Sequence, residues 1–177
     1  MRDDDALENN PHISRKALEG LHSQLFGWTL SRCNFERAVA EDLMQQAYVE
    51  VLSGRARFDN KSALKTFLFG VVQNLARSRF RRLSTRLRLL VSYGPQEEPF
   101  SQQPEPGAER ETRLVWRAVA ALPARQRDIT ELVFCREMTV EQAATVMGVT
   151  VGTARVHYDR AKKALAVKLA ELAGRSP

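Results

Sequence analysis

Residues 91–108 limit what this chain can fold into more than any other segment does. Between positions 91 and 111 the chain has four prolines, two glycines and five glutamates, against a single arginine. A stretch of this composition cannot bury an apolar core, and its prolines interrupt helices and strands alike. The sequence therefore predicts a flexible acidic linker over 91–108, with separate domains at 12–90 and 109–173. A length of 177 residues is enough for two small domains.

Both flanking segments have the apolar spacing of helices. Leu43, Ala47 and Val51 recur every four residues, which is typical of an amphipathic helix, and the expected buried stripe also includes Met44, Tyr48 and Leu52. A second helix opens near Ser62, and an earlier one around residues 18–30 completes a small bundle. No stretch alternates convincingly with the two-residue period of a strand. The sequence therefore predicts an all-α fold.

The charges of the chain are segregated. From Lys61 to Leu90 there are two lysines and six arginines and no acidic residue. The whole chain has a net charge of +6 and a pI near 9.7. This balance favours a polyanionic partner such as nucleic acid, although many basic proteins bind nothing of that kind.

Several classes of site are not indicated by the sequence. Cys33 and Cys135 belong to no CxxC or Cys/His cluster, so we expect neither a disulfide framework nor a metal site, and no cofactor. The first ten residues lack the apolar stretch of a signal peptide. No apolar run approaches the length of a membrane span. We therefore expect a cytoplasmic protein without membrane insertion.

The most specific local pattern is TVEQAATVMGVTVGTARVHYDRAKKAL. Thr139 is a good N-cap, and Gln142 stands three residues later as its capping-box partner. A helix-turn-helix needs small residues where its helices cross, and often a glycine at the turn. Ala144 and Gly148 stand four apart, as that crossing requires, and Thr150 caps the next helix. The expected buried stripe of this second helix is Ala154, Tyr158, Ala161 and Leu165.

The opposite face of the second helix has residue types that bind DNA. A helix in the major groove meets base edges with its N-terminal half. Arg155 fits a bidentate contact to guanine, and Asp159 either accepts from cytosine or orients an arginine. The candidate DNA-contacting residues are Thr153, Arg155, Val156, His157, Asp159, Arg160 and Lys163. The alternative is a helical hairpin with a solvated basic face, but the two caps, the small residue and the turn glycine together favour DNA binding.

Two blocks of the chain resemble the extracytoplasmic-function (ECF) sigma factors of bacterial RNA polymerase, in the sigma-70 family. The segment from Leu122-Pro123 through Arg127 to Gly152-Thr153 and Arg160-Ala161 resembles region 4. AEDLMQQAYVEVL and RFDNKSALKTFLFGVVQNLARSRFRR resemble region 2. The resemblance implies an alternative sigma factor that binds core polymerase and directs promoter recognition, DNA opening and transcription initiation. Such a protein is not an enzyme.

The resemblance to region 2 implies two binding tasks. Asp42, Gln45 and Gln46 match positions that bind a coiled coil of the polymerase β′ subunit, although the family often has Glu in place of Gln46. The second task is opening the promoter −10 element, for which Asn74 is the best candidate base contact. The other candidates are Phe58 and Asn60 in a loop at the rim of the base pocket, Phe67, and Arg77 and Arg81 along the strand. Phe67 replaces the usual Trp, and core packing is its favoured interpretation.

The resemblance to region 4 implies binding of the −35 element by the outward face of the helix-turn-helix. Val156, His157 and Asp159 depart from the common family pattern, so the residues leave the −35 sequence preference open. Val156 fits contact with a thymine methyl, whereas Asp159 is repelled by phosphate. The acidic linker matches the family segment that threads the RNA exit path of the polymerase. Members of the family are commonly held by an anti-sigma factor, which we expect as a further partner.

The two alternative functions are a transcription regulator that acts without core polymerase and an enzyme. A helix-turn-helix regulator that does not associate with core polymerase needs a sensor or dimerisation domain, and the basic stretch from Lys61 to Leu90 argues against a sensor there. An enzyme has little support, because His12, His22 and His157 have no matching carboxylate or nucleophile pattern. Association with core polymerase distinguishes the regulator from the sigma factor.

Overall fold

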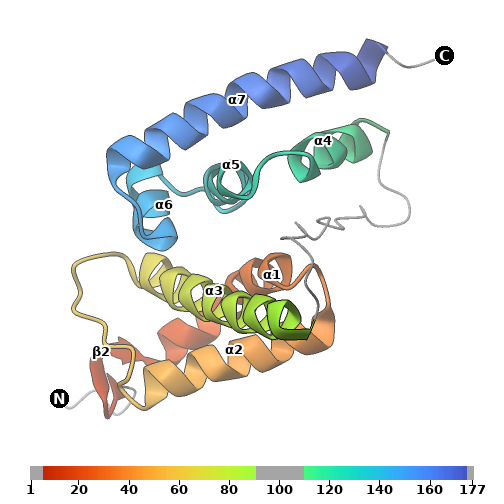
Figure 1. The fold of residues 1–177 in the computed structure, drawn as a ribbon. Coiled ribbons are helices and arrows are strands. Elements are labelled where there is room, and N and C mark those ends of the chain that lie inside the picture. Colours follow the sequence, from red (N-terminus) through yellow and green to blue (C-terminus); the bar gives the residue numbers. More distant parts are fainter. Residues whose placement is uncertain (1–5, 91–109, 175–177) are drawn as a thin grey trace. The chain divides into compact units, whose positions relative to one another are not determined.

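The computed structural model describes residues 6–90 and 110–174, which belong to two compact units (Figure 1). The predicted linker at 91–108 lies outside the described residues. Each unit is mostly helical, which confirms the predicted fold class. Among the helices of the described residues, none combines the length and apolar character needed to span a membrane. The same described residues contain no group of three or more His, Cys, Asp or Glu placed to hold a metal ion.

The first unit consists of three mutually packed helices, α1 (Arg15–Arg32), α2 (Arg37–Leu52) and α3 (Leu64–Leu90). Ser14 caps α1 by accepting a hydrogen bond from the amide of Ala17 at 3.1 Å. α2 ends at Leu52 with Ser53 as its C-cap, and the following Gly54 has a left-handed φ of 72°. This α1–α2–α3 arrangement confirms the expected bundle, with helix starts that differ by a few residues, as is usual at helix ends.

The core of this unit lies where the three helices meet. Trp28 of α1 stacks on Phe69 of α3 with ring centroids 5.5 Å apart, and its indole N–H donates to the Phe69 carbonyl at 3.2 Å. Both side chains are fully buried, so the hydrogen bond satisfies a polar group that would otherwise be costly to bury. The apolar residues packed around them include Leu25, Leu43, Val51, Leu68 and Val72.

A short antiparallel hairpin, β1 (Ala6–Leu7) and β2 (Asn10–Ser14), precedes α1. It pairs Ala6 with Ser14 and Leu7 with Asn10. The sequence analysis predicted no strand, because strands of two and five residues are too short to establish a two-residue period. The hairpin nevertheless buries Ile13 fully and Asn10 almost fully, so it is part of the first unit's core.

The second unit consists of α4 (Arg110–Ala120), α5 (Ala124–Thr130), the π-helix η1 (Glu131–Cys135), α6 (Val140–Met147) and α7 (Val151–Gly174). α7 packs on α4, α5 and α6 (Figure 1). Ile129, Leu132, Met147 and Ala154 are fully buried between these helices. The guanidinium of Arg127 donates to the Ala120 carbonyl at 3.2 Å and so caps the end of α4. This contact gives a physical reason for the arginine after the Leu122-Pro123 pair.

Candidate nucleic-acid interface

The predicted caps of the helix-turn-helix are all present. The Thr139 hydroxyl accepts from the amide of Gln142 at 3.2 Å, and the Gln142 side chain accepts from the amide of Thr139 at 3.0 Å. Gly148 then takes the left-handed conformation, with φ of 62° and ψ of 42°. The Thr150 hydroxyl accepts from the amide of Thr153 at 3.2 Å, which caps α7. These bonds fix where α6 ends and where α7 begins.

The two helices of this motif cross at small residues. Ala144 of α6 and Ala154 and Ala161 of α7 are buried, as the sequence predicted. Tyr158 and Leu165 on the same stripe are only half-buried. The crossing therefore depends on alanine, which lets the backbones approach closely, and it leaves the opposite face of α7 free.

That opposite face contains the predicted −35 contacts. Thr153, Arg155, Val156, Asp159, Arg160 and Lys163 are all exposed, whereas His157 is half-buried. Asp159 forms an ion pair with Lys162 at 3.1 Å, so its negative charge is partly balanced where we expected repulsion from phosphate. The Lys162 ammonium also lies 4.5 Å from the centre of the Tyr158 ring. Most of the candidate residues thus share one accessible, mainly basic surface.

The structure adds Glu141, which the sequence analysis did not single out. Its carboxylate on α6 binds the guanidinium of Arg155 on α7, with Oε1 and Nη2 2.9 Å apart. Hydrogen bonds from a backbone amide and from Arg155 lower the pKa of Glu141 below its ordinary value. The pair holds the guanidinium from the side of α6. Glu141 belongs to the first turn of α6, and only the packing of α6 on α7 brings the two charges together.

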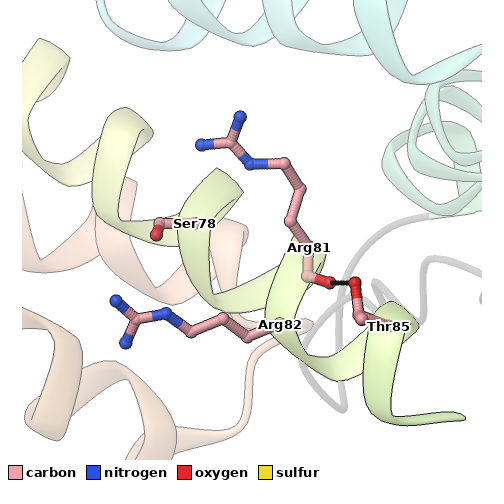
Figure 2. A pocket seen from close by; sticks show the side chains of 4 residues that line it. All are labelled: Ser78, Arg81, Arg82 and Thr85. Carbon is pink, nitrogen blue, oxygen red and sulfur yellow. Dashed lines mark hydrogen bonds between the residues drawn. The ribbon is translucent and has the colours of Figure 1, made fainter. Parts of the chain in front are cut away.

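A second candidate surface follows α3 in the first unit. Asn74 and Arg81 are exposed, Arg77 is half-buried, and Arg79 and Arg82 add two further exposed guanidinium groups. Ser78, Arg81, Arg82 and Thr85 line a shallow hollow of about 520 Å³, in which the two arginine side chains point apart (Figure 2). The Thr85 hydroxyl donates to the Arg81 carbonyl at 2.9 Å. The exposed cations are suited to a nucleic-acid backbone, which has one negative charge per nucleotide.

The loop between α2 and α3 buries Phe58 and exposes Asn60. The Phe58 ring is 7% exposed and packs against the half-buried Phe67 ring of α3, with centroids 5.1 Å apart. In this structure Phe58 supports the loop and offers no free face on which a base could stack. Asn60 is exposed, with a left-handed φ of 59°. Beside it, Asp59 accepts from the Lys61 amide at 3.2 Å and forms an ion pair with its ammonium at 2.8 Å.

The exposed face of α2 contains Asp42, Gln45 and Gln46, the predicted polymerase contacts. Val49 and Leu52 continue the same face at spacings of three and six residues beyond Gln46, and they are 51% and 47% exposed. The inclusion of Leu52 in the buried stripe of this helix was therefore wrong. Leu52 lies on the outward face of α2 with Gln45 and Val49, away from the core formed by Leu43, Ala47 and Val51.

An apolar cavity of about 300 Å³ lies within the second unit, between α4, the continuous segment α5–η1, and α7. Phe134 is 58% exposed at its edge and packs on Tyr158 with ring centroids 5.9 Å apart. The other apolar lining residues include Val115, Trp116, Val119 and Leu165. The sequence analysis did not predict this cavity, since its walls come from three separate segments.

Both units match models of a known family. Residues 19–86 match Sigma-70 region 2, and residues 112–165 match Sigma-70, region 4. The chain is 30% identical over 130 residues to the ECF RNA polymerase sigma factor EcfG of Rhodopseudomonas palustris (strain TIE-1), covering 73% of this chain and 71% of that protein. It is 26% identical over 167 residues to the ECF sigma factor SigF of Caulobacter vibrioides (strain NA1000 / CB15N), covering 92% and 89%.

Two solved structures share the fold. The sigma factor RpoE from Bartonella quintana, in complex with the anti-sigma factor NepR, matches with a TM-score of 0.71 and 22% identity over 88% of this chain and 96% of that chain. CnrH, in complex with the cytosolic domain of CnrY, matches with a TM-score of 0.58 and 20% identity over 92% of both chains.

Proposed function

This chain belongs to the sigma-70 family as an ECF sigma factor that directs RNA polymerase in transcription initiation, and we propose that its two units divide promoter binding between them. The first unit, expected at 12–90, binds core polymerase and the −10 element. The second, expected at 109–173, binds the −35 element. A sigma factor is a non-enzymatic subunit of the polymerase, so no residue is assigned a catalytic role.

The observation that carries the −35 assignment is the exposed face of α7 in a fully capped helix-turn-helix. Arg155 lies in the N-terminal half of α7, where a recognition helix meets base edges. We assign Arg155 to a guanine, Val156 to a thymine methyl, and Arg160 and Lys163 to phosphates. Thr153, His157 and Asp159 complete the contacting face. Thr153 also shares a hydrogen bond with Thr150 at 2.9 Å, which orders the start of the helix.

The −10 assignment is supported by the exposed row along α3. Asn74 and Arg81 are seven residues apart, which places them on nearly the same helical face. An amide can donate to and accept from the edge of an unpaired base, whereas a guanidinium binds the strand's phosphates. We assign Asn74 to a base, Arg77 and Arg81 to the backbone, and Asn60 to the rim of the pocket. Phe58 and Phe67 pack against each other beneath the exposed surface of the loop and so support that pocket.

The exposed face of α2 is the proposed contact with core polymerase. Asp42, Gln45 and Gln46 supply its polar part, and Val49 and Leu52 extend it with an apolar part. Exposed apolar side chains next to polar ones are typical of binding surfaces. The β′ coiled coil is the expected partner on this face.

An anti-sigma factor is a further proposed partner. The solved structures of RpoE and CnrH contain the anti-sigma factor NepR and the cytosolic domain of CnrY, respectively. The similarity of fold over most of this chain supports a partner of the same class. We also propose a cytoplasmic location, because binding to RNA polymerase and promoter DNA requires it. A regulator independent of polymerase loses its support, since the first unit matches Sigma-70 region 2.

In vitro transcription from a randomised promoter library tests the proposed function. Core polymerase with this protein should produce transcripts whose promoters share two sequence elements at −35 and −10. Core polymerase alone is the control and should produce no such enrichment. Failure of the protein to co-elute with core polymerase, or enrichment of only one element, contradicts the proposed division between the units.

A further inference from the structure

We propose that Asn10, in the N-terminal hairpin, is a positioning residue for the −10 interaction. Its side chain holds the loop between α2 and α3 in the shape that binds the unpaired DNA strand. This inference rests on the proposed function, because that function assigns the loop to the rim of the −10 pocket. The region 2 match begins at residue 19, so the hairpin lies outside it.

The Asn10 side-chain amide makes three hydrogen bonds, one to the last turn of α2 and two to the loop that follows it. Its Nδ2 donates to the carbonyls of Val51 and Ala56, the latter at 3.0 Å, and its Oδ1 accepts from the amide of Phe58 at 2.9 Å. Asn10 is 2% exposed, so water cannot replace these bonds. Only a side chain with two N–H donors and an acceptor in this geometry satisfies all three backbone groups.

The three bonds fix the path of the chain into the proposed pocket. Their backbone partners extend from Val51, near the end of α2, to Phe58, which directly precedes Asp59 and Asn60. The Phe58 ring in turn packs on Phe67 of α3, seven residues before Asn74. Asn10 therefore acts on the side of the loop that is away from solvent, while Asn60 and Asn74 remain exposed.

Further contacts hold Asn10 itself in place. The neighbouring Ile13 is fully buried, and Leu7 pairs with Asn10 across the hairpin. Asn9 donates to the Leu52 carbonyl at 2.9 Å, but this bond is exposed to solvent. Asn9 and Asn10 thus both donate to carbonyls at the end of α2, Asn9 in one bond that is accessible to water and Asn10 in a buried one. This difference makes Asn9 a matched control.

The test uses holoenzyme assembled from the full chain with Asn10→Ala, Asn9→Ala or Asn74→Ala. The probe is a single-stranded oligonucleotide with the −10 sequence that wild-type holoenzyme selects from a randomised library, together with versions altered at one base. Asn10→Ala should weaken binding about tenfold and reduce discrimination between matched and altered strands. Asn9→Ala should stay within about twofold of wild type, because water replaces its exposed bond. Binding to a −35 duplex and assembly with core polymerase should be unchanged by either substitution.

Three results overturn the proposal. The first is strand binding and discrimination by Asn10→Ala equal to those of wild type. The second is an equal loss of −10 binding, −35 binding and core assembly, which indicates a structural role alone. The third, relevant if Asn10→Ala does not fold, is full discrimination by the milder Asn10→Ser, which keeps one donor and one acceptor. Normal discrimination by Asn74→Ala contradicts instead the proposed function, so the two failures are distinguishable.

Discussion

At the residue scale, we expect the exposed Arg155–Glu141 ion pair to bear on recognition more than on stability. Both side chains are more than half exposed, and exposed pairs contribute little to folding. The pair restricts where the Arg155 guanidinium points. Glu141→Gln should leave the melting temperature unchanged and reduce discrimination for guanine at −35 by roughly threefold, because the arginine loses a charge-assisted partner. Binding to duplexes with single-base changes measures this, with the exposed Glu171→Gln on α7 as the control. Unchanged discrimination contradicts the orienting role.

The same pair has a defined pH dependence. Hydrogen bonds from a backbone amide and from Arg155 lower the pKa of Glu141, so the carboxylate stays charged to a lower pH than that of a free glutamate. Any stability from the pair is fully present above the ordinary glutamate pKa and is lost as the pH falls through the lowered pKa. An NMR titration should find the Glu141 pKa below that of a free glutamate. In Arg155→Ala it should move part of the way back, and an identical value in both proteins contradicts the pairing in solution.

Gly54 is a residue whose backbone conformation matters. Its φ is 72°, and a Cβ placed there would lie 3.0 Å from the Cβ of Asn9. Gly54→Ala should therefore destabilise the first unit by about 1–2 kcal/mol, measured by denaturant unfolding. Gly20 in α1 is the control, because nothing lies within 4 Å of its added Cβ and alanine favours a helix by about 1 kcal/mol. Equal effects of the two substitutions are incompatible with this explanation.

At the scale of elements, the caps define the helix-turn-helix. Thr139→Ala removes the hydroxyl that accepts from Gln142 and should cost the second unit about 1 kcal/mol in unfolding free energy. Thr145 on the same helix is the control, since its exposed hydroxyl only donates back to the Glu141 carbonyl at 3.2 Å. Thr145→Ala should change stability little. A larger loss for Thr145→Ala than for Thr139→Ala contradicts the capping role.

The elements that could be predicted are those with a local signal. The spacing of Leu43, Ala47 and Val51 predicted α2, and Thr139, Gly148 and Thr150 predicted the boundaries of the helix-turn-helix. The N-terminal hairpin and the π-helix η1 have no such signal. The hairpin is held by Asn10, whose partners are 41 to 48 residues away, and no local pattern reveals a contact over that separation.

The candidate site residues also divide into those that the sequence could predict and those that depend on tertiary packing. Asn74 and Arg81 were predicted as candidates by the resemblance to region 2, and Arg155 by its place on the face of the second helix opposite the buried stripe. The burial of Phe58, the exposure of Leu52 and the pairing of Glu141 with Arg155 all depend on how separate elements pack. Sequence periodicity states which residues share a face, but not how much of that face a neighbouring helix covers.

At the scale of the whole molecule, we propose two different tasks for the two units of one basic chain. The net charge of +6 accounts for a general affinity for DNA that salt weakens. It does not distinguish opening a duplex from reading one. That distinction rests on an exposed amide on α3 in the first unit and an exposed guanidinium on α7 in the second.

The most direct test compares Asn74→Ala and Arg155→Ala in holoenzyme on the same promoter. Permanganate reactivity of unpaired thymines measures promoter opening, and equilibrium binding to a −35 duplex measures reading of that element. Asn74→Ala should lower opening more than duplex binding, and Arg155→Ala should lower duplex binding more than opening. Equal losses of both activities in both variants would contradict the division of promoter binding between the two units.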